Sequence, residues 1–218
     1  MGLKLNLMDR YPRVKNRQLE RTEISDLERE ISRKFDFDYF DGLRRYGYGG
    51  FYYDPKYWKD TVDLFTEHYK LKINSSILDV GCAKGFMLRD FREKLPNAIL
   101  RGLDISEYAI RNSDSLVKHD LVIGNATDLP FPANSFDLVI SINALHNLPK
   151  EDCVKALKEI ERVGRGSTFI MVDGWKTNEE KDLLEKWVLT AKTVLSESEW
   201  VALFESANYT GDFQFWKV

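Results

Sequence analysis

Two polar side chains, His146 and Asp173, each follow an apolar run of buried-strand type, and both are suited to accept a proton. His146 comes after a strand expected at residues 136–141, and Asp173 ends one expected at residues 167–173. Strand ends of this kind line the ligand crevice of open α/β sheets. An imidazole or a carboxylate in that crevice could serve as a general base. The two residues are rival candidates, and for His146 packing or cofactor contact without proton transfer is the alternative.

A glycine turn follows an earlier apolar run, at residues 77–80. Gly81 and Gly85 bracket this turn, which leads directly into a helical pattern that stops at Pro96. The Gly-x-x-x-Gly spacing differs from the Gly-x-Gly-x-x-Gly of nicotinamide-binding proteins, and no Gly-Lys-Ser or Gly-Lys-Thr of a P-loop follows it. The turn therefore favours a ligand that has a ribose but lacks a polyphosphate.

Two further signals follow the glycine turn at suitable intervals. A second strand, expected at residues 98–103, ends in Asp104, at the distance of about 20 residues where doubly wound folds place the carboxylate that binds a ribose diol. Asn125 and Ala126 then lie in a polar loop that precedes the next strand. The order of strand, turn, helix, strand and acid predicts a nucleotide-binding half-fold.

Together these stretches resemble the class I S-adenosylmethionine-dependent methyltransferases, in particular the small-molecule subgroup often called type 11, over residues 77 to about 173. The resemblance implies an α/β fold, Rossmann-like and doubly wound, with a mostly parallel sheet and helices on both faces. It also implies S-adenosyl-L-methionine as the cofactor. The residues that would contact this cofactor are Asp79, Gly81, Cys82, Gly85, Asp104, Ile105, Asn125, Ala126 and Asn143.

By the same resemblance, Asp79 and the glycine turn would face the amino-acid end of the cofactor, Asp104 its ribose, and Asn125 with Ala126 its adenine. The family usually has an acid where this chain has Asn125, whose amide oxygen can still accept a hydrogen bond but carries no charge. Lys84 stands where the family more often has a small or polar residue. The sequence assigns Lys84 no role.

We expect a single domain. In it, residues 71–218 form the cofactor-binding part and residues 1–70 form an N-terminal cap and lid. Residues 39–53 are rich in tyrosine and glycine, which is typical either of a loop that closes over a polar ligand or of a packed surface loop. Arg44 or Arg45 could bind a phosphate or carboxylate bidentately. The candidate substrate-binding residues are Arg44, Tyr46, Tyr48, Tyr52 and Trp175.

Helices are further expected at residues 60–70, 150–163 and 178–194. His119 is expected to cap the C-terminus of the helix after Asp104. One strand, at residues 213–218, ends the chain, whereas family members usually finish with an antiparallel pair. The far edge of the sheet is therefore expected to be shortened or covered by another subunit, which leaves a homodimer open.

Composition excludes several classes of protein. The chain of 218 residues has a formal net charge of −3, which gives no general attraction for nucleic acid. Its apolar runs are too short for a membrane helix and no signal peptide is apparent, so the cytoplasm is the expected location. Two cysteines do not make a disulfide framework, and three scattered histidines predict no metal site.

The sequence therefore predicts methyl transfer from S-adenosyl-L-methionine to a small-molecule acceptor. The chain also resembles, more loosely, methyltransferases encoded among bacterial surface-polysaccharide biosynthesis genes. This resemblance is carried by residues 39–53 and by the residues near Trp200 and Tyr209. It implies O-methylation of a sugar, sugar nucleotide or phosphorylated precursor. The alternatives are a methyltransferase for an unrelated amine or carboxylate and a non-catalytic cofactor-binding partner or regulatory protein. A nicotinamide reductase is disfavoured by the glycine spacing.

Overall fold

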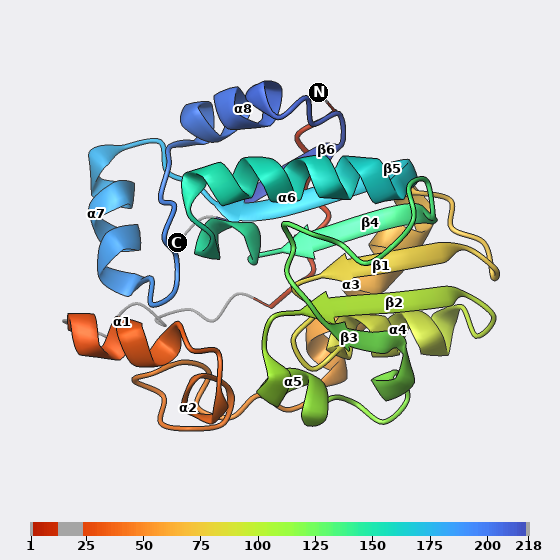
Figure 1. Ribbon diagram of the computed structural model, residues 1–218, viewed down its shortest axis with the longest axis horizontal. Coiled ribbons are helices and arrows are strands. Elements are labelled where there is room, and N and C mark those ends of the chain that lie inside the picture. The colour runs from red at the N-terminus through yellow and green to blue at the C-terminus, as the bar shows by residue number, and fades with distance from the viewer. Residues whose placement is uncertain (1, 13–23, 217–218) are drawn as a thin grey trace.

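A six-stranded sheet with the order β3-β2-β1-β4-β5-β6 forms the centre of the computed structural model, which describes residues 2–12 and 24–216 (Figure 1). All five strand pairs are parallel, which confirms the predicted α/β, Rossmann-like fold. The strands are β1 (Ser76–Val80), β2 (Ile99–Asp104), β3 (Leu121–Ile123), β4 (Phe136–Ile142), β5 (Gly164–Asp173) and β6 (Asp212–Trp216). The helices are α1 (Asp26–Ser32), α2 (Phe37–Phe40), α3 (Pro55–His68), α4 (Phe86–Lys94), α5 (Glu107–Arg111), α6 (Lys150–Val163), α7 (Asn178–Trp187) and α8 (Glu197–Ser206), with short 3-10 turns η2 (Lys118–Asp120) and η3 (Leu145–Asn147).

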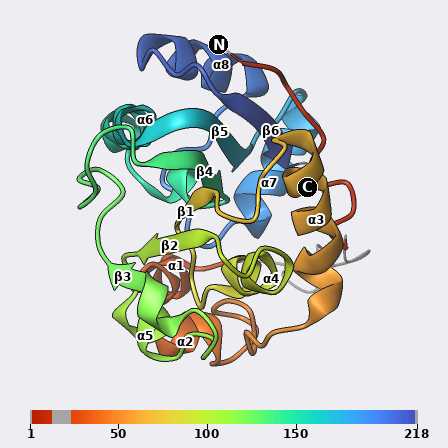
Figure 2. The same cartoon turned by 90° about the vertical axis from the view of Figure 1, so that its right-hand side faces the viewer.

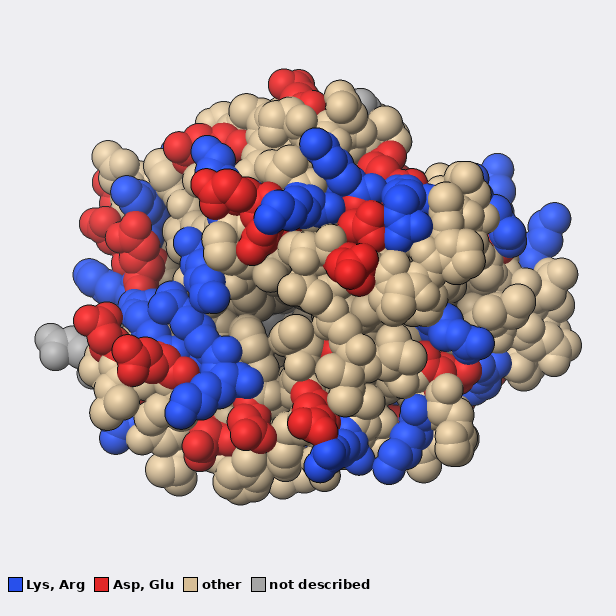
Figure 3. Space-filling model, viewed as in Figure 1, with Lys and Arg blue, Asp and Glu red and all other residues tan. Residues whose placement is uncertain are grey.

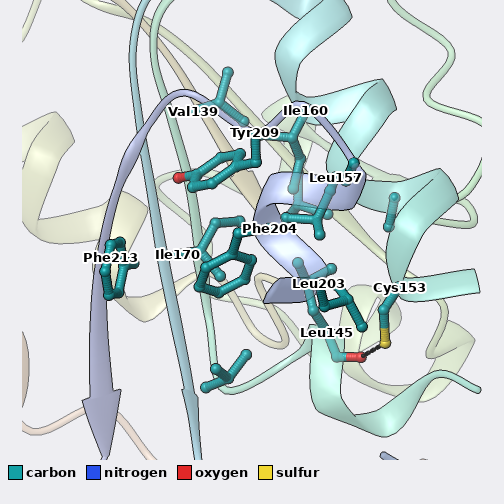
Figure 4. Packing of buried hydrophobic residues seen from close by; sticks show 14 of the residues in the cluster. Val139, Leu145, Cys153, Leu157, Ile160, Ile170, Leu203, Phe204, Tyr209 and Phe213 are labelled. Carbon is teal, nitrogen blue, oxygen red and sulfur yellow. Dashed lines mark hydrogen bonds between the residues drawn. The ribbon is translucent and has the colours of Figure 1, made fainter. Parts of the chain in front are cut away.

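Helices cover both faces of the sheet, α3 and α4 on one and α6 and α8 on the other (Figures 1 and 2). On α6 the buried residues Cys153, Ala156, Leu157 and Ile160 recur at helical spacing. Figure 4 shows Leu157 and Ile160 beside Phe204 of α8, within the cluster that also contains sheet residues. Each such aliphatic side chain contributes about 1.5–3 kcal/mol when it is fully buried, so this packing stabilises the attachment of α6 and α8 to the sheet.

Most predicted elements agree with the structure. The helix expected at residues 60–70 begins earlier, at Pro55, because Asp54 caps it, and two further predictions are wrong. The helix expected at residues 178–194 ends at Trp187, because the following residues bond to other parts of the chain: the Lys192 and Thr193 N–H groups both donate to the His146 carbonyl. His119 caps no helix after Asp104, because α5 already ends at Arg111 and His119 lies in η2.

The far edge of the sheet is covered by the chain's own N-terminal residues. The Leu5 N–H donates to the Phe213 carbonyl at 2.8 Å, and the Phe213 N–H donates to the Leu3 carbonyl at 3.0 Å. β6 is a single strand that runs parallel to β5. The resemblance led us to expect a shortened edge or one covered by another subunit, and in the structure residues of the same chain cover it. The strand ends at Trp216, and the last two residues of the predicted strand lie outside the described part of the chain.

The strands point toward the side of the molecule where α1, α2 and α7 lie (Figure 1). Two arginines of the N-terminal part hold the segment that follows α7: Arg29 donates to the carbonyls of Glu185 and Val188, and Arg33 to those of Thr190 and Ala191. Basic side chains gather over this junction, whereas acidic and basic residues alternate over the rest of the face in Figure 3. Among the described residues, no helix combines the length and apolarity needed to span a membrane.

Candidate active site

A pocket opens at the carboxyl ends of β1, β4, β5 and β6. The strand order reverses direction between β1 and β4, and such switch points leave a crevice for ligands. The polar groups that line the pocket include Asp79, Asn143, His146 and Asp173, and its other walls are mostly aromatic and apolar. The pocket therefore combines a few polar side chains with a large apolar surface, as small-molecule sites do.

The glycine turn, residues 81–85, forms one wall of the pocket. Gly81 and Gly85 have positive φ angles of 87° and 77°, which glycine adopts without the cost that a side chain imposes. A Cβ atom at Gly81 would stand 2.3 Å from the Cβ of Ala144, so a larger residue would clash with the chain after β4. The N–H groups of Gly81 and Cys82 donate to the Leu103 carbonyl at 2.7 and 3.1 Å. The turn is thus fixed against β2 and presents backbone to the pocket.

Two buried acids flank this turn. Asp79 is only 6% exposed, and the loss of hydration on burial, together with the nearby charge of Asp104, raises the pKa of its carboxyl to about 7. Burial also raises the pKa of Asp104, although backbone N–H groups oppose that shift. The Asp104 carboxylate accepts from the Ser106 N–H and the Ala83 N–H, each at 2.8 Å. Since a carboxylate offers about four acceptor positions, Asp104 retains capacity for a ligand.

His146 and Asp173 come together, as expected from their strand ends. The Asp173 backbone N–H donates to His146 Nδ1 at 3.2 Å, and Asp173 Oδ2 lies 3.5 Å from the same nitrogen. Both side chains are buried, and burial raises the pKa of Asp173, partly opposed by His146. Because Nδ1 accepts a hydrogen bond, a neutral His146 carries its proton on Nε2. In that state Nε2 is a donor, which favours the Asp173 carboxylate as the proton acceptor.

The predicted cofactor residues divide between the pocket and its surroundings. Asp79, Gly81, Cys82 and Asn143 line the pocket. The other predicted residues do not line it: Gly85, Asp104, Ile105, Asn125 and Ala126. Of these, Asp104 is joined to the turn through the Ala83 N–H. The side-chain oxygen of Asn125 accepts from the Thr127 N–H at 3.0 Å, which shapes the loop after β3.

The predicted substrate residues divide in the same way. Arg44 and Tyr48 line the pocket, whereas Tyr46, Tyr52 and Trp175 do not. Tyr52 is 75% exposed, and Trp175 packs against the apolar cluster at α7. The pocket instead has lining residues that the sequence reading did not single out, at Met8, Tyr11, Trp58, Met171, Trp187 and Trp216. They come from remote parts of the chain, and no local motif marks them.

Three of these lining residues pack together. The ring centroid of Tyr11 lies 4.9 Å from that of Trp58 and 5.9 Å from that of Trp216, both in edge-to-face geometry. This aromatic group joins the N-terminal residues, α3 and the end of β6 at one side of the pocket. Within the described residues, no group of three or more His, Cys, Asp or Glu side chains is arranged to hold a metal ion.

Comparison with known proteins agrees with this geometry. Residues 78–172 match a family model described as a methyltransferase domain. This part of the chain is therefore similar to methyltransferase domains. The matched residues run from β1 to the end of β5 and include the glycine turn, Asp104 and His146. A solved SAM-dependent methyltransferase of Methanosarcina mazei also shares the fold, with a TM-score of 0.52 at 20% identity, covering 65% of this chain and 82% of that chain.

Curated relatives match over the same region. A tRNA (carboxymethyluridine(34)-5-O)-methyltransferase of Arabidopsis thaliana is 34% identical over 134 residues, covering 60% of this chain and 31% of that protein. A demethylmenaquinone methyltransferase of Listeria monocytogenes is 32% identical over 136 residues, 56% of this chain and 55% of that protein. The chain thus spans about half or less of these relatives. The YcgJ protein of Bacillus subtilis shares the fold, with a TM-score of 0.56 at 22% identity, covering 67% of this chain and 66% of YcgJ.

Proposed function

We propose that the protein transfers the methyl group of S-adenosylmethionine to an oxygen atom of a small molecule bound in this pocket. One observation carries the proposal: the Asp173–His146 pair lines the same pocket as Asp79 and the glycine turn. A proton acceptor and a cofactor-binding turn thus meet in one space. A binding or regulatory protein needs the turn, but it does not need a buried proton acceptor in the same pocket.

The residues around the turn suit the cofactor in the arrangement that the sequence suggested. In this proposal the amino-acid end is bound by four residues that line the pocket: Asp79, Gly81, Cys82 and Asn143. Asp104, with Ile105, binds the ribose through its remaining acceptor positions. Asn125 and Ala126 contact the adenine. Gly85 holds the turn at the start of α4.

The cofactor supplies a methyl group on a positively charged sulfur, which is already activated toward attack by oxygen. The chain's residues then have two tasks, to align the acceptor oxygen with the methyl group and to take the hydroxyl proton. Alignment alone can contribute about 7–11 kcal/mol. In our proposal the O–C bond forms as the C–S bond breaks, and the proton passes to the Asp173 carboxylate. His146 Nδ1 accepts from the Asp173 backbone N–H, which fixes the backbone that carries this carboxylate.

The acceptor proposed from the sequence is a sugar, a sugar nucleotide or a phosphorylated precursor. Tyr48 and Arg44 on the pocket wall support it, since tyrosine can stack on a sugar ring and a guanidinium can bind a phosphate. A second candidate is a flatter, more apolar ring that bears a hydroxyl group. The aromatic group of Tyr11, Trp58 and Trp216 favours this candidate, as does the similarity to a demethylmenaquinone methyltransferase.

Calorimetry with S-adenosylhomocysteine tests the cofactor assignment. Hydrogen bonds to a charged partner contribute about 1.5–3 kcal/mol, so Asp104→Ala should weaken binding by about tenfold or more. Unchanged affinity in a folded Asp104→Ala variant would contradict the assignment. Transfer of a labelled methyl group to panels of sugar phosphates and of phenols or hydroquinones then separates the two acceptor classes. Failure of every hydroxyl acceptor, with amines or carboxylates methylated instead, would refute O-methylation.

A further inference from the structure

Lys84 is a buried lysine in the middle of the glycine turn. It is 5% exposed, and its Nζ atom lies 2.9 and 2.7 Å from the two carboxylate oxygens of Asp41 and 2.9 Å from the Phe51 carbonyl. Since an ammonium group has three N–H donors, these contacts use its capacity fully. The Lys84 side chain therefore points into the segment of residues 39–53, which we call the aromatic segment.

Asp41 collects four hydrogen bonds at the other end of this contact. Besides Lys84, it accepts from the Tyr108 hydroxyl at 2.6 Å and from the Phe51 N–H at 2.9 Å. Burial alone raises the pKa of the Asp41 carboxyl, but these hydrogen bonds outweigh it and hold the pKa below its ordinary value. A buried ion pair is retained without a large cost only when its remaining donors and acceptors are satisfied, and here they are.

The aromatic segment forms one side of the pocket, and its other contacts lead back to the same turn. Tyr39, Arg44, Gly47 and Tyr48 line the pocket. The Phe51 ring lies 4.3 Å from that of Tyr48 and 5.0 Å from that of Phe86, the first residue of α4, between centroids. Lys84 thus holds the backbone of the segment at the point where its rings pack on the helix that the turn begins.

A second ion pair of the segment offers a comparison. Arg45 donates to Glu28 through Nε and Nη2 at 3.0 and 2.8 Å, but its side chain is 60% exposed and the pair joins the segment to α1. Exposed pairs of this kind contribute little. The Lys84–Asp41 pair is buried and joins the segment to the glycine turn, so of these two pairs it is the one that can transmit a change in the turn to the pocket wall.

We propose that Lys84 and Asp41 are positioning residues that couple the cofactor-binding turn to the aromatic segment, so that the acceptor side of the pocket takes its shape only when the turn is ordered. Cofactor binding would then order the wall that receives the acceptor, which favours cofactor binding first. The inference rests on the proposed function for the identity of the ligand. The mechanical coupling itself rests on the contacts of Lys84 alone.

Hydrogen exchange with mass spectrometry tests the coupling in the double variant Lys84→Met/Asp41→Asn. Removing both charges avoids leaving one buried and unpaired. Lys84→Gln/Asp41→Asn, which also removes both charges, serves if the first double variant fails to fold, and Arg45→Met is the matched control. Couplings between sites are typically about 5- to 150-fold, so in the ligand-free double variant amides of residues 39–53 and 81–85 should both exchange at least about fivefold faster. In Arg45→Met, residues 81–85 should exchange as in the wild type.

The second arm adds saturating S-adenosylhomocysteine. In the wild type it should slow exchange at residues 39–53 at least about fivefold, whereas in the double variant it should slow residues 81–85 but change residues 39–53 less than about twofold. Wild-type protection of residues 39–53 in the double variant, or unchanged exchange of its residues 81–85, would overturn the coupling. If calorimetry shows no binding even to the wild type, the proposed function fails, and the ligand-free comparison still decides the coupling.

Discussion

Replacing Asp79 by Asn should change the pH dependence of stability in a direction that the structure determines. Burial and Asp104 raise the pKa of Asp79 from 3.8 to about 7 in the folded protein. Between these values the folded state keeps a proton that the unfolded state has lost, so the free energy of unfolding falls as pH rises from about 4 to about 7. Each pH unit in this window corresponds to about 1.4 kcal/mol. From pH 5 to pH 7 the loss is about 3 kcal/mol, and it then stays constant.

An asparagine cannot ionise, so Asp79→Asn should remove this loss. The assay is urea unfolding followed by tryptophan fluorescence at pH 5 and pH 8, for the wild type and for the variant. The difference in unfolding free energy between variant and wild type should be about 3 kcal/mol more favourable to the variant at pH 8 than at pH 5. The same difference at both pH values would refute the argument that a buried, protonated Asp79 is part of the ligand-free protein.

Asp137→Asn is the control with the opposite sign. Hydrogen bonds from Arg165 and Ser76 outweigh burial and lower the pKa of Asp137, so its ionised form adds stability that is present above the unfolded-state pKa and is lost as pH falls through the folded value. Asp137→Asn should therefore be more destabilising at pH 8 than at acid pH. A trend of the same sign for both variants would point to a general effect of pH on the protein.

Three further outcomes follow from the site and its surroundings. Asp173→Asn should lower turnover by about 10²- to 10⁴-fold with S-adenosylhomocysteine binding retained, and His146→Gln should lower it less; the reverse order would make His146 the base. Arg29→Met should lower the unfolding free energy by about 1.5–3 kcal/mol, because two backbone carbonyls lose a charged donor, and unfolding at the wild-type urea midpoint would contradict this. Burial raises the pKa of the Cys82 thiol, and that of Cys153 to about 11, so a thiol reagent at pH 8 should label neither in the folded protein; rapid labelling would show that the site opens.

The cofactor-binding part of the fold could be predicted because its signals are local. Each parallel strand is an apolar run, and each helix beside it has an amphipathic period that the chain itself displays. The helix predicted at residues 150–163 matches α6, and the strand predicted at residues 136–141 differs from β4 by one residue. The juxtaposition of His146 and Asp173 followed from the same rule, since both come at the ends of neighbouring parallel strands.

The remaining features depend on contacts between distant residues, which no local pattern records. The partner of Lys84, Asp41, lies 43 residues earlier in the chain. The sequence of the turn alone therefore could not predict the role of Lys84. The segment after Trp187 has apolar residues at helical spacing, yet its backbone groups bond to Arg29, Arg33 and His146 instead. These tertiary hydrogen bonds outweigh helix propensity, which amounts to a few tenths of a kcal/mol per residue. The aromatic walls of the pocket were missed for the same reason.

The N-terminal residues on β6 also bear on how this protein avoids aggregation. An edge strand offers unpaired N–H and C=O groups to any other strand that meets it. Here the Leu3 carbonyl and the Leu5 N–H pair with the N–H and the carbonyl of Phe213. Phe213 is synthesised long after these two residues. Until β6 is synthesised, Leu3 and Leu5 have no strand to pair with. If Leu3 and Leu5 are lost, the exposed edge of the folded sheet can pair with a strand of a second chain. A deletion of residues 2–5 is therefore expected to favour self-association of folded molecules while leaving the glycine turn, residues 81–85, intact.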